Sequence, residues 1–165
     1  MTFECLKSDG RRRGLASDWE AWLREADSRY GRYSERIDAS SFDFNEVSAV
    51  GFLAAAAART GFLTLNEYVI VKSDRRKKVP GRADLWMAGE TRAYSFEFKR
   101  AWHSATKKNL EAIMTKARGD IDSINRDESN YAAAVVLAYV RDEDRVPRYR
   151  DYAGNEHVDF AYKRW

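Results

Sequence analysis

The chain has 165 residues, of which 44% are hydrophobic and 13% aromatic, and its 29 Lys and Arg against 26 Asp and Glu give a formal net charge of +3. At this length one core buries roughly 70% of the surface of the unfolded chain, so we expect a single folded domain over residues 1–165 rather than a disordered chain. The single cysteine, Cys5, excludes a disulfide framework, and the longest apolar stretch, residues 49–58, is shorter than the roughly 20 residues of a membrane span, so we expect a cytoplasmic protein with no membrane partner.

Residues 1–40 are predicted to form an N-terminal helical extension. The opening sequence, up to Gly14, has no apolar segment of the kind found in secretory signals. Ser17 and Glu20 then have the spacing of a capping box. Apolar residues recur here at helical spacing, at Leu15, Trp19, Trp22, Leu23, Ala26 and Tyr30. These features predict an amphipathic first helix whose apolar face packs in the core.

A second helix is predicted after a polar, serine-rich stretch. Asp43 and Glu46 have the spacing of another capping box, and the Ala-rich residues 47–60 continue the helix up to Gly61, a residue typical of helix ends. The small alanine side chains would allow this helix to pack closely against a sheet.

The spacing of the apolar residues then changes from helical to extended. Residues 62–71 and 82–87 are predicted as strands joined by a basic turn. Residues 92–100 are predicted as a third strand, in a hairpin that turns at residues 88–90.

A third helix is predicted over residues 104–125, and the near-continuous apolar run at residues 131–140 is typical of a strand buried on both faces. The tail, residues 141–165, has two aromatic segments around Gly154 that favour a final hairpin. The order of elements predicts an α/β fold with a mixed sheet flanked by helices on both faces, and a core over residues 43–140.

Basic residues gather in two runs. Residues 72–82 carry six Lys or Arg against one acidic residue, and residues 99–118 also carry six against one. Such runs are common on solvated turns and helix faces, but two runs that flank an acidic cluster suit a phosphate backbone. We therefore expect nucleic acid as a partner, bound by Arg75, Arg76, Lys77 and Lys78 in the turn and by Lys107 and Lys108 on the helix. For the two helix lysines a solvated surface is an equal alternative.

The acidic cluster lies on the predicted hairpin. Glu97 and Lys99 are one residue apart on a strand, so their side chains project from the same face. The turn at residues 88–91 can bring Asp84 close to Glu97. Two close carboxylates repel each other unless a cation lies between them, and Mg²⁺ prefers carboxylate, carbonyl and water ligands. A neighbouring lysine can orient an attacking water and offset charge at a phosphate.

These residues predict a metal-assisted phosphodiesterase. The plainer alternative is an ordinary surface ion pair between Glu97 and Lys99, with Asp84 a surface residue that binds nothing.

The hairpin also resembles a known family. The segment GRADLWMAGETRAYSFEFKRAW, with Asp84, twelve intervening residues and then Glu97-Phe98-Lys99, resembles the signature of the PD-(D/E)XK nuclease superfamily. This superfamily includes restriction endonucleases and Holliday-junction resolvases. Its core of helix, three antiparallel strands, helix and strand can be laid over residues 43–140 in that order. Ala83 stands where the signature has proline, a position without a chemical role.

The resemblance implies a restriction-endonuclease-like fold with an extra N-terminal helix, and a Mg²⁺- or Mn²⁺-dependent endodeoxyribonuclease. By this resemblance Asp84 and Glu97 would ligate the metal with the backbone carbonyl of Phe98, and Lys99 would serve the water. Glu46 matches an acidic residue that family members often add from the first core helix, and the capping box accounts for it equally well.

Two other classes of function stay open. One is a catalytically inactive module of the same fold that binds nucleic acid or protein, and the intact set of Asp84, Glu97 and Lys99 argues against it. The other is an interaction module, such as an immunity or adaptor protein, which predicts neither metal binding nor salt-dependent affinity for DNA. For the nuclease, a homodimer is a hypothesis because cutting both strands needs two sites. DNA structure or a partner protein would be other sources of specificity.

Overall fold

The computed structural model describes residues 13–37, 42, 45–74, 77–102, 106–124, 127–139 and 159–164. The elements in chain order are α1 (Arg13–Ile37), α3 (Glu46–Arg59), β1 (Leu63–Asp74), β2 (Lys77–Ala88), β3 (Ala93–Trp102), α4 (Lys107–Asp122), β4 (Tyr131–Tyr139) and β5 (Asp159–Arg164). The strands form one sheet in the order β1-β2-β3-β4-β5. β3 and β4 are parallel and the other neighbours are antiparallel, so the sheet is mixed, as predicted.

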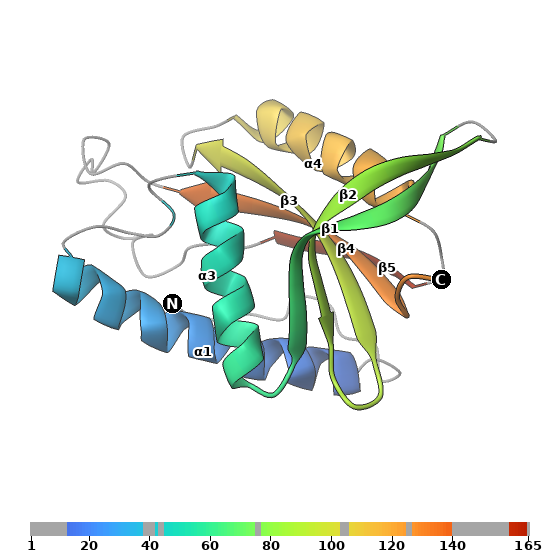
Figure 1. Ribbon diagram of the computed structural model, residues 1–165. Coiled ribbons are helices and arrows are strands. Elements are labelled where there is room, and N and C mark those ends of the chain that lie inside the picture. The colour runs from blue at the N-terminus through green and yellow to red at the C-terminus, as the bar shows by residue number, and fades with distance from the viewer. Residues whose placement is uncertain are drawn as a thin grey trace.

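Helices cover both faces of this sheet, which confirms the predicted α/β architecture (Figure 1). α1 and α3 pack on one face, where their apolar side chains join those of β2, β3 and β4. α4 packs on the other face, with Ala117 and Ile121 against Ala132 and Ala134 of β4. Residues 132–137 of β4 are all buried, as expected for a strand covered on both faces. No helix in the described segments combines the length and apolar character needed to cross a bilayer.

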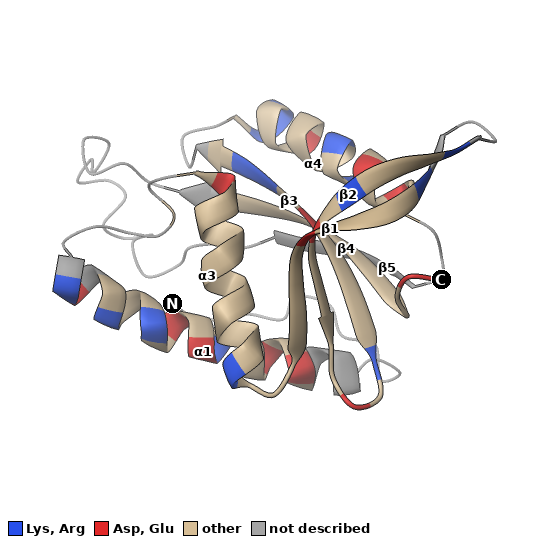
Figure 2. Cartoon of the chain, viewed as in Figure 1, with Lys and Arg blue, Asp and Glu red and all other residues tan. Residues whose placement is uncertain are grey.

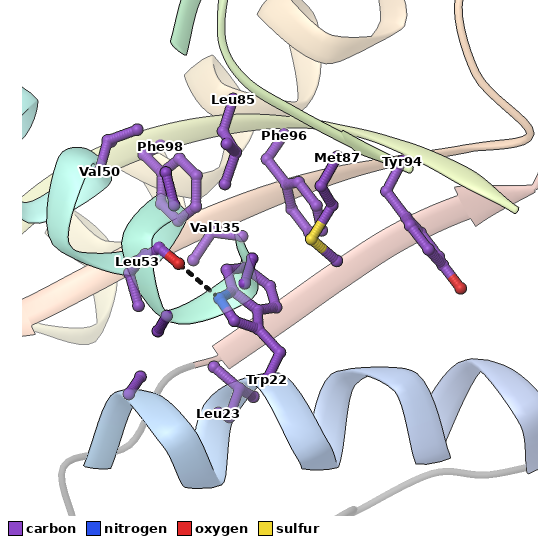
Figure 3. Packing of buried hydrophobic residues seen from close by; sticks show 14 of the residues in the cluster. Trp22, Leu23, Val50, Leu53, Leu85, Met87, Tyr94, Phe96, Phe98 and Val135 are labelled. Carbon is purple, nitrogen blue, oxygen red and sulfur yellow. Dashed lines mark hydrogen bonds between the residues drawn. The ribbon is translucent and has the colours of Figure 1, made fainter. Parts of the chain in front are cut away.

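The N-terminal helix belongs to the core and is more than an extension. Trp22 of α1 is fully buried, and its ring lies 5.1 Å from the ring of Phe96 of β3. Its indole Nε1 donates a hydrogen bond of 2.7 Å to the carbonyl of Leu53 on α3 (Figure 3). Burial of a large aromatic side chain with its one polar atom satisfied fixes α1 against both α3 and the sheet.

Both predicted capping boxes are wrong. α1 already includes Arg13, so Ser17 and Glu20 lie inside the helix rather than at its start. Asn45 caps α3, because its extended backbone lets the side-chain oxygen accept a hydrogen bond of 2.7 Å from Ser48 N. Glu46 is therefore the first residue of α3, two positions before the place where a capping box would need it.

Alanine in place of Gly61 should lower the free energy of unfolding by about 1 kcal/mol. Gly61 follows the C-cap residue Thr60 at φ 94°, where its N–H donates to Ala58 and the N–H of Phe62 donates to Ala57. Alanine avoids this left-handed conformation. In the interior of α1, Gly31 has open space around it, so Gly31→Ala should instead raise stability by about 0.5–1 kcal/mol. Urea denaturation of the two variants checks the opposite signs, and equal changes would contradict them.

The predicted basic turn is much shorter than expected. β1 runs to Asp74 and β2 starts at Lys77, so the two strands form a long ribbon and residues 72–74 and 77–82 lie on strands. Antiparallel pairing continues to Asp74 opposite Lys77 because each strand supplies backbone partners to the other. Of the predicted phosphate contacts, Arg75 and Arg76 lie outside the described residues.

The C-terminal tail adds an edge strand. β5 pairs antiparallel with β4, from Tyr131 opposite Arg164 to Val136 opposite Asp159. The other half of the predicted final hairpin lies outside the described residues, as do residues 104–105 and 125 of the predicted helix 104–125. The helix is shorter than predicted at its end, because α4 stops at Asp122 with Ser123 as its C-cap, and Ile124 pairs with Lys72.

Candidate active site

The β2–β3 hairpin brings Asp84 and Glu97 together. Its turn is closed by a hydrogen bond of 2.9 Å from Gly89 N to the carbonyl of Arg92. Pairing then runs back to Leu85 opposite Phe96, and Asp84 and Glu97 are the next residues on their strands. At this point a side chain replaces the backbone ladder, since Asp84 Oδ2 accepts a hydrogen bond of 2.6 Å from Phe98 N.

The partner ribbon is bent at the same level. Glu67 of β1 has φ 48°, a left-handed conformation that is uncommon for residues other than glycine, and it lies opposite Asp84 where the ladder skips one pair. Leu85 packs in the core on the α1 and α3 side, whereas Ala83 packs on the α4 side. The bend therefore turns the β1–β2 ribbon toward α4, so that the ribbon, β3 and α4 surround Glu97.

Glu97 is the most buried acidic side chain of the site, with 6% of the residue exposed. Its Oε1 accepts a hydrogen bond of 2.9 Å from Lys99 Nζ. Its Oε2 is buried and accepts no hydrogen bond from any described residue. Lys72 Nζ lies 3.6 Å from this oxygen, which is an ion pair beyond hydrogen-bond length.

Lys99 is held between two acidic residues. In addition to Glu97, its Nζ lies 3.3 Å from Oδ2 of Asp120 on α4. Figure 2 shows acidic positions where β1, β2 and β3 meet, with basic positions along β2, β3 and α4. Glu97 and Lys99, which were predicted to project from the same face of one strand, thus form an inward-facing ion pair. The alternative of an exposed surface ion pair is excluded.

The two carboxylates disfavour each other's ionised form. Burial raises the pKa of Glu97, and the nearby charge of Asp84 raises it further, while Lys99 and Lys72 act in the opposite direction. Burial also raises the pKa of Asp84, against the hydrogen bond from Phe98 N and the charge of Lys99. A divalent cation would relieve both effects, because it favours the ionised form of each carboxylate.

Glu46 contributes charge to this site. Its carboxylate raises the pKa of Asp84, after the larger effects of burial, and so does that of Glu67. Among the described residues no three His, Cys, Asp or Glu side chains gather as a metal-binding group. Glu46 is not a capping-box residue, and a ligand role for it stays a prediction.

The predicted phosphate contacts lie on two separate elements, β2 and α4. Lys78 on β2, and Lys107 and Lys108 in the first turn of α4, are exposed. Lys107 lies 3.9 Å from Glu111 one turn along the same helix. The backbone of Lys77 begins β2, and its side chain lies outside the described residues.

Lys72 and Asp120 are site residues that the sequence prediction missed. Lys72 was one cation in a run of six, and its spacing does not distinguish it from its neighbours. Asp120 comes from α4, and only the packing of α4 on β3 brings it to Lys99. No local sequence signal marks either residue.

The residues present fit a hard divalent cation. Asp84 and Glu97 offer two carboxylates on adjacent strands, and Glu97 Oε2 is a buried acceptor without a hydrogen bond from the described residues. Mg²⁺ is usually held by one or two carboxylates and keeps several waters, so a third acidic side chain is not required. The carbonyl of Phe98 as a ligand stays a prediction.

No protein-family model and no curated protein matches the chain. A solved chain described as "Crystal structure of SSO0001" aligns with a TM-score of 0.41 and 14% sequence identity, over 87% of this chain and 61% of that chain. This chain thus spans less than two thirds of that chain's length. A likeness of this degree assigns neither a family nor an activity.

Proposed function

We propose that the protein is a Mg²⁺- or Mn²⁺-dependent nuclease that hydrolyses phosphodiester bonds in DNA at a PD-(D/E)XK-type site. The observation that carries this proposal is the Glu97 carboxylate, with Lys99 on one oxygen and no hydrogen bond from the described residues on the other, buried oxygen. Asp84 lies on β2 just beyond Leu85, where the backbone pairing with β3 ends. A buried carboxylate oxygen without a donor is costly, and a cation ligand would remove that cost.

The order of the elements supports the same proposal. α3, the antiparallel β1, β2 and β3, then α4 and the parallel β4 follow the order of the family's core. We therefore propose a restriction-endonuclease-like fold for this part of the chain, to which α1 adds a helix on the α3 side and β5 adds an edge strand.

The groups of the chain have distinct roles in the proposed reaction. A divalent cation held by Asp84, Glu97 and the carbonyl of Phe98 would supply a Lewis acid and a more acidic water. The hydrogen bond from Phe98 N holds the Asp84 carboxylate in one orientation. Lys99 is paired with Glu97 and Asp120, which favours its ammonium form. We assign to that ammonium the orientation of the water and the stabilisation of charge that develops on the phosphate.

Exposed lysines in the first turn of α4 would bind the phosphate backbone. If Lys107 and Lys108 each contact one phosphate, the double alanine variant should reduce the slope of log affinity against log salt by about 1.8 on double-stranded DNA. Fluorescence anisotropy at several salt concentrations, with chelator present, measures this slope. Arg24→Ala is the control, since Arg24 is an exposed cation of α1 paired with Glu20 on the other face of the sheet. An unchanged slope in the double variant would show that both lysines are only solvated.

The experiment that tests the proposed function is a cleavage assay on linear, supercoiled, single-stranded and branched DNA, with Mg²⁺, Mn²⁺ or chelator. Glu97→Ala and Glu97→Gln, purified in the same way, are the controls, and the second keeps the size of the side chain. We expect cleavage that needs the divalent cation and disappears in both variants. DNA binding without cleavage on every substrate would instead indicate an inactive binder, and neither binding nor cleavage would indicate an interaction module.

A further inference from the structure

Among the described side chains of the basic run 72–82, that of Lys72 is the one that pairs with Glu97. The Lys72 side chain is 20% exposed, whereas that of Arg82 in the same run is 69% exposed and pairs with Glu67. A backbone bridge between Lys72 and Ile124, just after α4, fixes this part of β1. The ammonium of Lys72 is thereby directed to Glu97 and not to solvent.

Gly81 leaves the space that the Lys72 side chain uses. A Cβ atom at Gly81 would lie 2.7 Å from Cδ and 2.8 Å from Cγ of Lys72, closer than such atoms approach in proteins. These are atoms in the middle of the side chain, so a methyl group here forces the whole stem of Lys72 to move. A small residue at this position is therefore a condition for the Lys72–Glu97 contact.

The two lysines hold Glu97 in different ways. Lys99 donates a hydrogen bond to Oε1 and is braced by Asp120. Lys72 lies 3.6 Å from Oε2, without a hydrogen bond to it. The ammonium of Lys72 therefore neutralises this oxygen without occupying its hydrogen-bonding position.

We propose that Lys72 is a positioning residue that neutralises Oε2, the buried oxygen of Glu97, until a divalent cation takes its place. The inference rests on the proposed function, because it assigns Glu97 as a cation ligand. On this account the cation and the Lys72 ammonium compete for one carboxylate oxygen. Once displaced, the ammonium stays beside the site on a partly exposed side chain, where it can attract an anionic substrate.

The test is calorimetric titration of the intact chain with Mn²⁺ and with Mg²⁺, at neutral pH and without nucleic acid. Lys72→Met keeps the apolar stem and removes the competing charge, so it should bind the cation about tenfold more tightly, a difference of 1.4 kcal/mol. Gly81→Ala keeps the charge but displaces the stem, and it should tighten binding in the same direction. Lys78→Met removes an exposed charge from the same run and should change the affinity by less than about twofold.

A second measurement separates competition from a merely structural ion pair. In chelator, Lys72→Met should melt at a lower temperature than the wild type, and added Mn²⁺ should raise its melting temperature by more, since tighter binding to the folded state stabilises it more. Unchanged or weaker cation binding in Lys72→Met would overturn the proposal. So would tighter binding in Lys72→Met and Lys78→Met but not in Gly81→Ala, which would indicate net charge alone. A failure of the proposed function is distinguishable, because the wild type itself would then neither bind the cation nor cut DNA.

Discussion

Replacing Lys99 by alanine should abolish DNA cleavage, with a loss of about 10²–10⁴-fold in rate, while DNA binding stays largely intact. Lys99 is one of many cations in the chain, and among the described residues it is the one that donates a hydrogen bond to Glu97. Its removal therefore takes away charge stabilisation at the reacting phosphate, whereas long-range attraction of DNA depends on many cations. Single-turnover cleavage and anisotropy in chelator measure the two effects separately.

Two further variants make this result specific to the ammonium group. Lys99→Met keeps the apolar stem between β3 and α4 and should lose as much activity as Lys99→Ala. Lys116→Ala removes an exposed lysine of α4 and should cut at the rate of the wild type. Cleavage by Lys99→Met within tenfold of the wild type would remove Lys99 from the catalytic machinery.

Replacing Asp84 by asparagine should weaken binding of Mg²⁺ or Mn²⁺ by at least about 10–100-fold, the loss typical of a group that supports a metal site. The asparagine oxygen can still accept the hydrogen bond from Phe98 N, so the hairpin keeps its local geometry. What disappears is one of the two negative charges that a cation would bridge. Calorimetric titration measures the change, and Glu90→Gln, an exposed acidic residue in the turn of the same hairpin, is the matched control.

The same substitution should raise thermal stability when no divalent cation is bound. Burial raises the pKa of Asp84 and of Glu97 in the folded state, and the Asp84 charge raises that of Glu97 further, so the ionised pair lowers stability as pH rises through these pKa values. Asp84→Asn removes this effect at neutral pH. Near pH 3, at or below the ordinary pKa values of both acids, the effect is largely absent and the melting temperatures should converge. A lower melting temperature of the variant at neutral pH would contradict the electrostatic description of the site.

The candidate site is therefore an arrangement of opposite charges, and we propose that a cation completes it. Two carboxylates on β2 and β3 are balanced by Lys99 on one side and Lys72 on the other, and one buried oxygen of Glu97 still lacks a hydrogen bond from the described residues. In structures generally, buried polar atoms are nearly always satisfied, so such an atom calls for an explanation. The proposed divalent cation provides it.

Local sequence patterns were enough to predict most of the elements. The hairpin from residue 82 to residue 100 follows from its strand residues and the turn at Gly89, and pairing along it leaves Asp84 and Glu97 as neighbours. The alternation of side chains along β3 directs the phenylalanines to one face and Glu97 and Lys99 to the other. The buried strand β4 follows from its apolar composition.

Helix ends and the extent of the ribbon were less predictable. Asp43 and Asn45 are both good capping residues, and the choice between them depends on the backbone conformation where α3 meets the rest of the chain. The basic residues 72–82 have the composition of a turn, yet β1 and β2 continue through most of them because each strand supplies backbone partners to the other.

The sequence by itself determined the order of the elements, the proximity of Asp84 to Glu97 and the position of Lys99, because all three depend on contacts between residues near in the chain or joined by one short turn. Only the tertiary structure decided which further charges reach the site. Lys72 reaches Glu97 because of the bend at Glu67 and the space at Gly81. Asp120 reaches Lys99 because α4 packs on β3. These contacts join residues distant in sequence, and their energies depend on burial and on distances of a few ångströms, which local sequence patterns do not specify.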